Sequence, residues 1–473
     1  GLNSTHLIPW DEAIYAKISK NMVMGNEYVV QRWIPDRVWY EKPPLYMWMV
    51  AGLMKYLGFS SIVARLPSAF FGILTVLLVY KFAGKFFTRT AGFIAALALI
   101  TTTHFLYYSR ASMLDVTCTF FITLSLYFYI SRDTRREWMY FIFSGLSAGL
   151  AVMTKGVVGL MPFLIMGVYE TYVLLTDKNV TWVSITKRFL ITLGAGMVVA
   201  LPWHLIMYKM YGTAFIGNYL GYHVFDRAFS AIEDKGRPIL WYLEVMKVSM
   251  RIWFVALIPA LGYAVYRVFK WDKRGIFFLT WFALILGFFT AAQSKLTWYI
   301  IPIYPVACIL VGWFSERILS FILNKLPRNN TLQLKALLLY LLLISALFYL
   351  FLNRKLVYTT DLTGSQARLL IAKDEIFGTE KKVYIDRLEL PLALYYTDGP
   401  YEIIDFMPNI TSRVPEVARQ NEELILITKK GRFSKEVKRY TYEPVIVKED
   451  GDWVLWYMPS EDEVNGLIKS VKF

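Results

Sequence analysis

The stretch SIVARLPSAFFGILTVLLVYKFAGKFFTRTAGFIAALALI at residues 61–100 contains two apolar runs separated by a short basic segment. A helix needs about 20 apolar residues to cross the hydrocarbon core of a bilayer, and the first run is long enough. The segment between the runs carries Lys81, Lys85 and Arg89, and loops on the cytoplasmic side of a membrane are enriched in Lys and Arg. The stretch therefore predicts two helices that cross a membrane and are joined on its cytoplasmic side.

The composition of the whole chain agrees with a membrane protein. Hydrophobic residues make up 56% of the 473 residues and charged residues 18%, whereas a soluble chain carries about 25% charged residues. The formal net charge of +15 favours anionic lipid as a partner rather than nucleic acid. Cys118 and Cys308 both lie in apolar runs and fit neither a metal motif nor a disulfide framework. A soluble multidomain enzyme, a disordered regulator and a disulfide scaffold are excluded.

Apolar runs of similar length recur along most of the chain. We expect spans at 62–86, 91–108, 112–131, 137–154, 157–176, 187–209, 241–268, 275–292, 298–322 and 334–353. Every second connection is rich in Lys and Arg, so those connections face the cytoplasm and the others face outward. Because the chain starts on the outer side and without Met, we expect a preceding signal or membrane segment, giving about eleven spans.

The charge distribution predicts two domains. Residues 356–473 carry 16 basic and 20 acidic residues, whereas residues 1–355 carry 35 basic and 16 acidic residues. We expect 1–355 to form the membrane domain and 356–473 to form a small α/β domain on the outer side. In the tail, β-rich runs and the Asp450-Gly451 pair between two strand-like runs predict strands and a hairpin.

The first outer loop, residues 1–61, contains two apolar stretches that are too short to span a membrane. In residues 11–24, Ile14, Ile18 and Met22 recur at helical spacing, and residues 44–57 are rich in aromatic residues. Both predict helices that lie in the interface plane.

Six short polar clusters lie on the predicted outer face, at Asp11-Glu12, Tyr40–Pro44, Ser109–Asp115, Thr154–Gly156, Tyr222–Arg227 and Ser294–Tyr299. Ionisable residues at membrane depth predict function. Four of the clusters also have a structural interpretation: Asp11 can cap a helix, Lys42 can extend to the headgroups, Arg110 can pair with Asp115, and His223 can be a hydrogen-bonded structural residue. A lone His beside carboxylates is weak support for a metal.

The clusters place cations on the outer face, where the enrichment of Lys and Arg in cytoplasmic loops does not account for them. These cations are Lys42, Arg110, Lys155, Arg227 and Lys295. They predict an anionic ligand that reaches membrane depth. Mid-span acids are nearly absent, which disfavours a pump or channel. No glycine-rich phosphate loop, zincin helix or nucleophile elbow occurs, so a nucleotide-driven transporter and a serine hydrolase are disfavoured and no nucleotide cofactor is expected.

Seven fragments, in this order, resemble the bacterial polyprenyl-phosphate-dependent glycosyltransferases with the C-type membrane fold. They are DEAIYAKISKNM, EKPPLYMW, SRASMLD, TKG, LPWH, HVFDR and SKLTWYIIPIYP, which together cover nearly all of residues 1–305. The family includes the aminoarabinose transferase of lipid A and, more distantly, the protein O-mannosyltransferases. Lys42-Pro43-Pro44 stands where the latter typically have His-Pro-Pro, so the resemblance favours the lipid A enzymes. It implies a polytopic α-helical membrane protein with a small periplasmic α/β domain.

The resemblance also implies roles for individual residues. Asp11 and Asp115 are similar to the two active-site acids, and Glu41 and His223 to positions associated with a divalent metal ion. Lys42 resembles the lysine near the donor phosphate. Further phosphate or substrate contacts are implied or expected for Arg110, Lys155, Arg227, Lys295 and Tyr299.

The activity that the resemblance implies is the inverting transfer of a sugar from an undecaprenyl monophosphate donor to a lipid acceptor. The expected acceptor is lipid A, at the periplasmic face of the bacterial inner membrane. Two alternatives remain open: a protein O-mannosyltransferase-like enzyme acting on Ser or Thr, and a non-catalytic lipid flippase. A flippase has no need of the acids Asp11 and Asp115. The sequence predicts neither the sugar nor the identity of the metal.

Overall fold

The computed structural model describes the chain in two compact units. Residues 1, 3–4, 35–36, 133–134, 227–235, 326–327, 353–363, 387–389, 398, 405–422, 431–444 and 460–473 lie outside the description. One unit is residues 25–358, and the other joins residues 1–24 to residues 359–473. The expected boundary after residue 355 falls among residues that are not described. The grouping of residues 1–24 with the tail differs from the expectation that they belong to the membrane domain.

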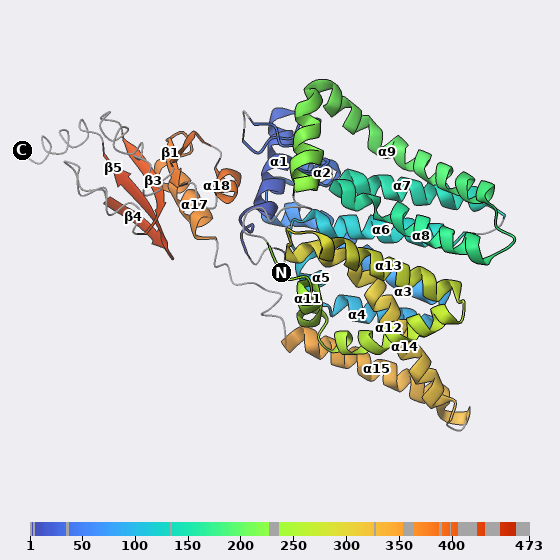
Figure 1. Ribbon diagram of the computed structural model, residues 1–473. Helices are drawn as coiled ribbons and strands as arrows, with labels where there is room; N and C mark the ends of the chain where they lie inside the picture. Colours follow the sequence, from blue (N-terminus) through green and yellow to red (C-terminus); the bar gives the residue numbers. More distant parts are fainter. Residues whose placement is uncertain are drawn as a thin grey trace, which may run out of the picture. The chain divides into compact units, whose positions relative to one another are not determined.

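The unit 25–358 is a helical bundle whose long helices run in roughly one direction (Figure 1). Its helices are α2 (Leu45–Leu57), α3 (Ser61–Phe86), α4 (Arg89–Ile100), α5 (Thr103–Tyr108), α6 (Leu114–Ile130), α7 (Glu137–Lys155), η1 (Gly156–Leu160), α8 (Met161–Thr176), α9 (Trp182–Ile216), η2 (Gly217–Asp226), α11 (Trp241–Met250), α12 (Ile252–Phe269), α13 (Lys273–Ala291), η4 (Thr297–Ile303), α14 (Tyr304–Leu323) and α15 (Arg328–Leu352). The predicted short helix at 44–57 is confirmed as α2.

Seven helical segments of the described chain are long and apolar enough to cross a membrane. They are Ser61–Phe86, Glu137–Thr176, Trp182–Gly221, Ile252–Phe269, Lys273–Ala291, Thr297–Leu323 and Thr331–Leu352. Two further apolar helices, α4 with 12 residues and α6 with 17, are shorter. The prediction of a polytopic helical membrane protein is confirmed.

Two predicted spans differ from the observed helices because each is broken. The predicted span 91–108 is divided into α4 and α5. The hydroxyls of Thr101 and Thr102 donate to the carbonyls of Leu97 and Ala98, at 2.6 and 2.8 Å, and such bonds back to the preceding turn accompany the end of a helix. The predicted span 241–268 is divided at Arg251, whose φ of 49° is incompatible with a helix.

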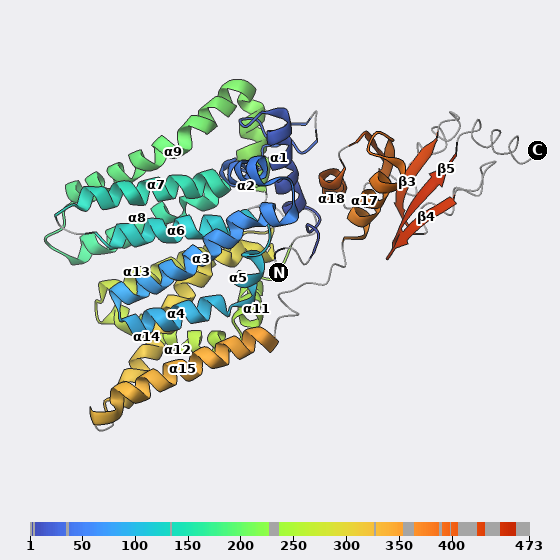
Figure 2. The ribbon, with the colours of Figure 1, turned by 180° about the vertical axis from the view of Figure 1, so that it is seen from behind.

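Small residues allow the helices to approach closely at two crossings. A Cβ on Gly312 of α14 would lie 2.4 Å from the carbonyl oxygen of Ala91 in α4, and one on Gly145 of α7 would lie 2.1 Å from that of Thr192 in α9. Membrane helices associate through such close packing because lipid tails are as apolar as the side chains. By contrast, α9 and α15 lie on opposite flanks of the bundle (Figure 1, Figure 2) and are largely exposed, as expected of lipid-facing helices.

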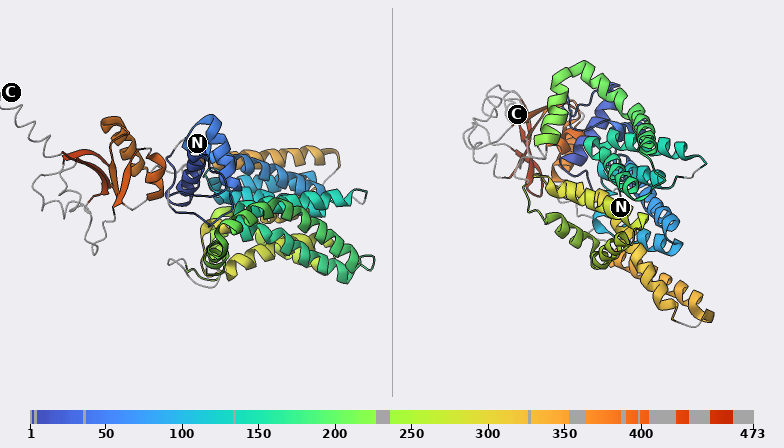
Figure 3. Two further views of the ribbon diagram at one scale, coloured as in Figure 1. Left: turned by 90° about the horizontal axis from the view of Figure 1, so that it is seen from above. Right: turned by 45° about the vertical axis from the view of Figure 1, so that its right-hand side comes forward.

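The second unit contains α1 (Asp11–Gly25), α17 (Ser365–Phe377), α18 (Leu390–Tyr396) and strands β1 (Val383–Asp386), β2 (Tyr401–Ile404), β3 (Leu424–Lys429), β4 (Val445–Asp450) and β5 (Trp453–Met458). The strand order is β2-β1-β3-β5-β4, with β1 parallel to β2 and β3 and with β5 antiparallel to β3 and β4. Figure 3 shows the strands side by side, in orange-red, with the orange helices next to them. The predicted strands and the hairpin at Asp450-Gly451 are confirmed.

Helix α1 packs on α18 within this unit. The Lys20 ammonium donates to the carbonyl of Tyr395 at 2.9 Å, and the Leu7 amide donates to the Tyr396 hydroxyl at 3.2 Å. The residues from Glu12 to Lys20 are all buried. These contacts explain why the start of the chain groups with the tail.

We predict that Gly312→Ala destabilises the bundle, because the added methyl group would force α4 and α14 apart. Overpacking of this kind costs about 1–3 kcal/mol. Thermal unfolding of the detergent-solubilised protein measures the effect. Gly287→Ala in α13 is the matched control, since nothing lies within 4 Å of its Cβ position. Equal melting temperatures for the two variants would contradict the close approach.

Candidate functional site

The centre of the candidate site is a buried ion pair between Asp115 and Lys155. Asp115 lies in the first turn of α6 and Lys155 is the last residue of α7, and their side chains are only 1% and 5% exposed. Lys155 Nζ donates to Asp115 Oδ1, whereas the buried Oδ2 has no hydrogen-bond partner among the described residues. The described ion-pair partner of Asp115 is therefore Lys155, whereas the sequence had left Arg110 open as a possible partner. The pair leaves one carboxylate oxygen available to accept a further hydrogen bond.

The ring of Tyr299 covers the same ion pair. Tyr299 lies in η4, and the Lys155 ammonium is 4.8 Å from the centroid of its ring, within the range of a cation–π contact. Helices α6, α7 and η4 thus bring together three residues from separate sequence clusters. The structure thus brings Asp115, Lys155 and Tyr299 together, and the roles that the resemblance implies for them stay predictions.

A chain of hydroxyl groups fixes the start of α6. The Tyr46 hydroxyl of α2 is 2.8 Å from Ser68 Oγ of α3 and 3.3 Å from Ser112 Oγ. Ser68 Oγ donates in turn to the carbonyl of Met113 at 2.8 Å. Tyr46, Ser68 and Ser112 are all fully buried, where an unsatisfied polar group is costly. The Pro43-Pro44 segment, α3 and the segment before Asp115 are therefore held in one arrangement.

Two indole groups hold the segment before α2. Trp48 of α2 donates through Nε1 to the carbonyl of Tyr28 at 2.6 Å, and Trp203 of α9 donates to that of Val29 at 3.0 Å. The buried Gln31 amide donates to the carbonyl of Lys42 at 2.6 Å. These bonds fix the backbone on both sides of the Glu41-Lys42 pair.

The other predicted cations of this unit lie at less enclosed positions. Glu41, Lys42 and Arg110 are half-buried, and Lys42 Nζ donates to the carbonyl of Glu41 at 3.2 Å. Each of these three side chains has further interactions. The structure thus leaves Lys42 and Arg110 partly accessible to a ligand.

Lys295 is buried without a counter-charge among the described carboxylates. Its ammonium donates to the carbonyls of Ala292 at 2.6 Å and Arg237 at 3.4 Å. Burial lowers the pKa of Lys295, because water stabilises the charged form better than the protein interior does. A buried ammonium that lacks a described carboxylate partner can bind an anion such as phosphate.

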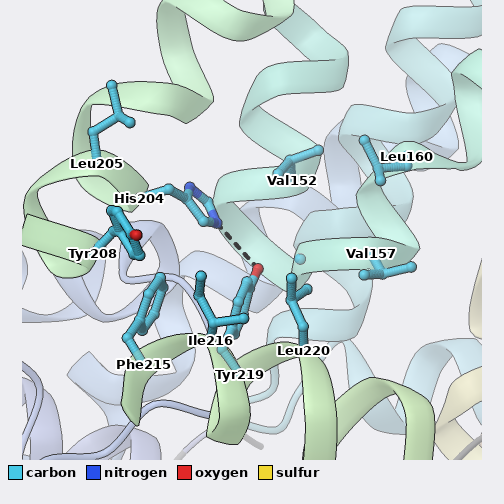
Figure 4. Close-up of a pocket in the computed structure, with 11 residues that line it drawn as sticks. Val152, Val157, Leu160, His204, Leu205, Tyr208, Phe215, Ile216, Tyr219 and Leu220 are labelled. Atoms are coloured by element: carbon cyan, nitrogen blue, oxygen red, sulfur yellow. Dashed lines mark hydrogen bonds between the residues drawn. The ribbon is translucent and has the colours of Figure 1, made fainter. Parts of the chain in front are cut away.

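An apolar groove of about 310 Å³ is lined in part by Gly156, the residue that follows Lys155 in the chain; Figure 4 shows most of the lining side chains. Its lining comes from α7, η1, α9 and η2, and consists of Val152, Gly156, Val157, Leu160, His204, Leu205, Tyr208, Phe215, Ile216, Tyr219 and Leu220. Gly156 follows Lys155 directly, with φ of 55°. A Cβ at Gly156 would lie 2.6 Å from the Tyr219 hydroxyl. Glycine is therefore required for two reasons, the positive φ and the lack of room for a side chain.

One polar pair interrupts the apolar lining. His204 Nδ1 is 2.7 Å from the carbonyl of Ala200, and Nε2 is 3.1 Å from the Tyr219 hydroxyl (Figure 4). A carbonyl only accepts, so Nδ1 carries the proton and, in the neutral ring, Nε2 accepts from Tyr219. The pair joins α9 to η2, the helix that contains His223.

Three of the predicted site residues lie outside what the structure describes of this unit. Asp11 begins α1, which belongs to the other compact unit. His223 lies in η2, but its side chain is outside the described part of the structure, and Arg227 is outside it altogether. The roles of Asp11, His223 and Arg227 stay predictions.

The side chain of only one of the two implied metal ligands lies in the described part of the structure. Among them, no three His, Cys, Asp or Glu side chains gather into a group that could hold one. Glu41 is described and half-buried, whereas the side chain of His223, the second implied ligand, is not described. Glu41 and His223 therefore stay predicted ligands, and no chemical step below depends on a metal.

Several residues that build the site were missed by the sequence interpretation. Tyr46 and Ser68 lie within apolar runs, and only their hydroxyls mark them as exceptional. His204 belongs to the LPWH fragment, but a pattern within a predicted span does not show that it contacts Tyr219. Arg65 is buried in α3, next to the carbonyl of Ala64 that accepts from Tyr46 at 3.4 Å. The sequence feature that could have identified Arg65 is the presence of an arginine near the start of a predicted span.

Comparison with known sequences identifies related proteins. Residues 41–206 match the family model described as dolichyl-phosphate-mannose-protein mannosyltransferase. An undecaprenyl phosphate-alpha-4-amino-4-deoxy-L-arabinose arabinosyl transferase of Pseudomonas aeruginosa is 29% identical over 366 residues, covering 74% of this chain and 63% of that protein. Transferase 1 of the same name from Pseudomonas fluorescens is 28% identical over 362 residues, with the same coverages.

Solved structures show the same architecture. The crystal structure of ArnT from Cupriavidus metallidurans bound to undecaprenyl phosphate matches with a TM-score of 0.74 and 18% identity, over 96% of this chain and 95% of that one. The oligosaccharyltransferase of Archaeoglobus fulgidus matches with a TM-score of 0.58 and 12% identity, over 90% and 66% of the two chains. At these identities the likeness is one of fold.

The chain is a relative of the polyprenyl-phosphate-dependent C-type glycosyltransferases. The resemblance predicted from the seven fragments is confirmed. The chain spans less than two thirds of the length of the two Pseudomonas relatives. The activity of those relatives therefore supports a proposal for this chain and does not by itself assign one.

We predict that Lys155→Met destabilises the protein by about 3–5 kcal/mol, because it leaves the Asp115 carboxylate buried without a counter-charge. The double variant Asp115→Leu/Lys155→Met should recover most of this loss, since no charge remains buried. Thermal unfolding in detergent measures both. Lys81→Met, at an exposed position on α3, is the control and should change little. A Lys155→Met protein as stable as the control would show that the pair is not held as described.

Proposed function

We propose that this chain transfers a sugar from a polyprenyl monophosphate donor to a lipid acceptor, with inversion at the anomeric carbon. The proposed acceptor is lipid A, and the proposed location is the periplasmic face of the bacterial inner membrane. The observation that carries the proposal is the buried Asp115–Lys155 pair together with an apolar groove that is lined by Gly156, the residue after Lys155. A lipid-linked phosphate needs both features at once, an apolar path for its tail and fixed charges at its head.

The groove suits the isoprenoid part of the donor. Its lining is apolar apart from the His204–Tyr219 pair and the Tyr208 hydroxyl, and it begins one residue from Lys155. Burial of hydrocarbon contributes about 0.8 kcal/mol per CH₂ group, so a few isoprene units provide substantial affinity without polar contacts. The tail would thereby hold the donor phosphate near the end of α7.

The chemical step is a single displacement. An acceptor oxygen forms a bond to the anomeric carbon while the bond from that carbon to the phosphate oxygen breaks. The phosphate leaves with the electron pair, and its growing negative charge is stabilised by fixed cations in a site of lowered dielectric. Lys155 and Lys295 are two of the buried cations described in this unit. They are proposed to supply this charge, and Lys42 and Arg110 are proposed to add to it.

The fate of the proton depends on the acceptor. If the acceptor is a hydroxyl, a carboxylate must take its proton, and Asp11 is the proposed general base. The unpartnered Oδ2 of Asp115 is proposed to accept a hydrogen bond from the sugar or the acceptor. If the acceptor is a lipid A phosphate, its oxygen is already ionised, and positioning rather than base catalysis determines the rate. Glu41 and His223 are proposed to hold a divalent metal ion, which would supply further positive charge there.

We predict that the purified protein transfers label from a polyprenyl-phosphate sugar to lipid A. Asp11→Asn and Asp115→Asn should each lower turnover by about 10²–10⁴-fold, as expected when a proton acceptor or its positioning partner is removed. The melting temperature of each variant is measured in parallel, because Asp115→Asn also removes the counter-charge of Lys155.

Each outcome of this assay separates the three candidate functions. Transfer to a Ser- or Thr-containing peptide instead of lipid A would indicate the protein O-glycosyltransferase. No transfer with any donor, together with transbilayer movement of the polyprenyl lipid in vesicles, would indicate the flippase. A helix-capping role for Asp11 predicts a lowered melting temperature with turnover retained.

We predict that Lys42→Ala weakens donor binding about tenfold to a hundredfold, because a charge-assisted contact to phosphate contributes about 1.5–3 kcal/mol. Lys42→Arg should restore part of the affinity, since it keeps the charge with a different reach. Donor affinity is measured by titration of the detergent-solubilised protein. Lys55→Ala, an exposed lysine on α2, the helix that follows Lys42, is the control. If Lys42 only extends to the headgroups, its Ala variant should stay within about twofold of the unmodified protein.

A further inference from the structure

The junction between α11 and α12 has a backbone conformation that two other helix breaks in the bundle achieve with glycine. Arg251 has φ of 49° and ψ of −114°. Gly156, between α7 and η1, has φ of 55° and ψ of −126°, and Gly212, within α9, has φ of 53° and ψ of −129°. A side chain disfavours this conformation, because its Cβ crowds the backbone. The chain therefore keeps an arginine where glycine would be the relaxed choice.

Hydrogen bonds from a neighbouring helix break hold the junction in place. The Trp253 indole donates to Thr101 Oγ1 at 2.7 Å, and the Thr103 hydroxyl donates to the carbonyl of Ser249 at 3.2 Å. A strained residue persists only where its surroundings fix the conformation. These bonds explain how the conformation is maintained, but they do not involve the guanidinium and so do not explain why the residue is arginine.

The surface around Arg251 combines positive charge with a lipid-facing apolar stripe. Arg251 is exposed, and so is Lys247, one turn earlier, which pairs with none of the carboxylates that the structure describes. Next to them, Val248, Ile252 and Val255 are 70%, 72% and 67% exposed. Helix α11 packs on α5 and η4, so the two cations lie at the end of the bundle that carries Tyr299. This end is predicted to face outward, and the enrichment of Lys and Arg in cytoplasmic loops does not account for basic residues there.

We propose that Arg251 and Lys247 form a binding site for the phosphate headgroup of an outer-leaflet lipid, with the exposed faces of α11 and α12 against its acyl chains. A guanidinium matches a phosphate in shape and charge and donates two parallel hydrogen bonds to it. The Tyr349 ring of α15 lies 5.6 Å from the Arg251 guanidinium carbon and orients it across the junction. The site lies on elements other than those of the proposed transfer site and does not depend on that activity.

The test uses a substitution whose two effects have opposite signs. Arg251→Gly relieves the backbone and removes the guanidinium. In nanodiscs of phosphatidylcholine alone, the variant should melt about 1–2 °C above the unmodified protein. When phosphatidic acid is titrated in, the unmodified protein should gain stability, and Arg251→Gly should need about tenfold more of that lipid for the same gain. Native mass spectrometry should show the same loss of retained phosphatidic acid.

Matched variants and a second anion complete the experiment. Arg251→Lys keeps the charge and should need no more than about threefold more phosphatidic acid. Lys270→Ala, at the opposite end of α12 and likewise exposed, should leave the titration unchanged. The proposal is overturned if Arg251→Gly responds to phosphatidic acid like the unmodified protein, whatever its own melting temperature. It is also overturned if inorganic phosphate at equal concentration produces the full gain, because the ligand would then be a soluble anion.

Discussion

The buried ion pair between Asp115 and Lys155 constrains the positions of the helices around it. Removing two charges from water costs several kcal/mol for each ion, and their attraction offsets that cost only at close range and in good geometry. The start of α6 and the end of α7 must therefore stay at a fixed separation. The hydroxyls of Tyr46, Ser68 and Ser112 supply this rigidity without adding charge, and a site held by such neighbours loses little order when a ligand binds.

Helix breaks place the polar residues of the bundle. An uninterrupted apolar helix offers a ligand only its side chains, whereas a break exposes backbone groups and changes the direction of the chain. Gly156 ends α7 directly after Lys155 and leaves room for the Tyr219 hydroxyl. The break at Thr101 and Thr102 similarly provides the hydroxyl that accepts from Trp253. Polar side chains thus gather at breaks, where the neighbouring helices satisfy their hydrogen bonds.

The sequence predicted the membrane class and the tail well, because both depend on local patterns. Apolar runs marked most helices, and the β-rich runs with Asp450-Gly451 marked the sheet. It did not predict the break at Arg251, since hydropathy averaged over a span is insensitive to one backbone angle. The packing of α1 on α18 was missed for another reason: Lys20 and Tyr395 are 375 residues apart, and no local pattern links them. For the site, the resemblance brought Asp115, Lys155 and Tyr299 together, whereas periodicity alone would have left them in separate clusters.

The two buried lysines of the bundle differ in the charge that they offer a ligand. Lys155 is paired with Asp115, so the pair has almost no net charge. Such a pair orients a ligand through hydrogen bonds more than it attracts the ligand's charge. Among the described residues, Lys295 is held by carbonyl oxygens, and those dipoles stabilise its charge without cancelling it. At about 4 Å and an effective dielectric constant near 20, one such charge attracts a phosphate charge by about 4 kcal/mol. If both lysines contact the donor as proposed, the net attraction for its phosphate comes from Lys295, which has no described carboxylate partner, while Lys155 orients the ligand.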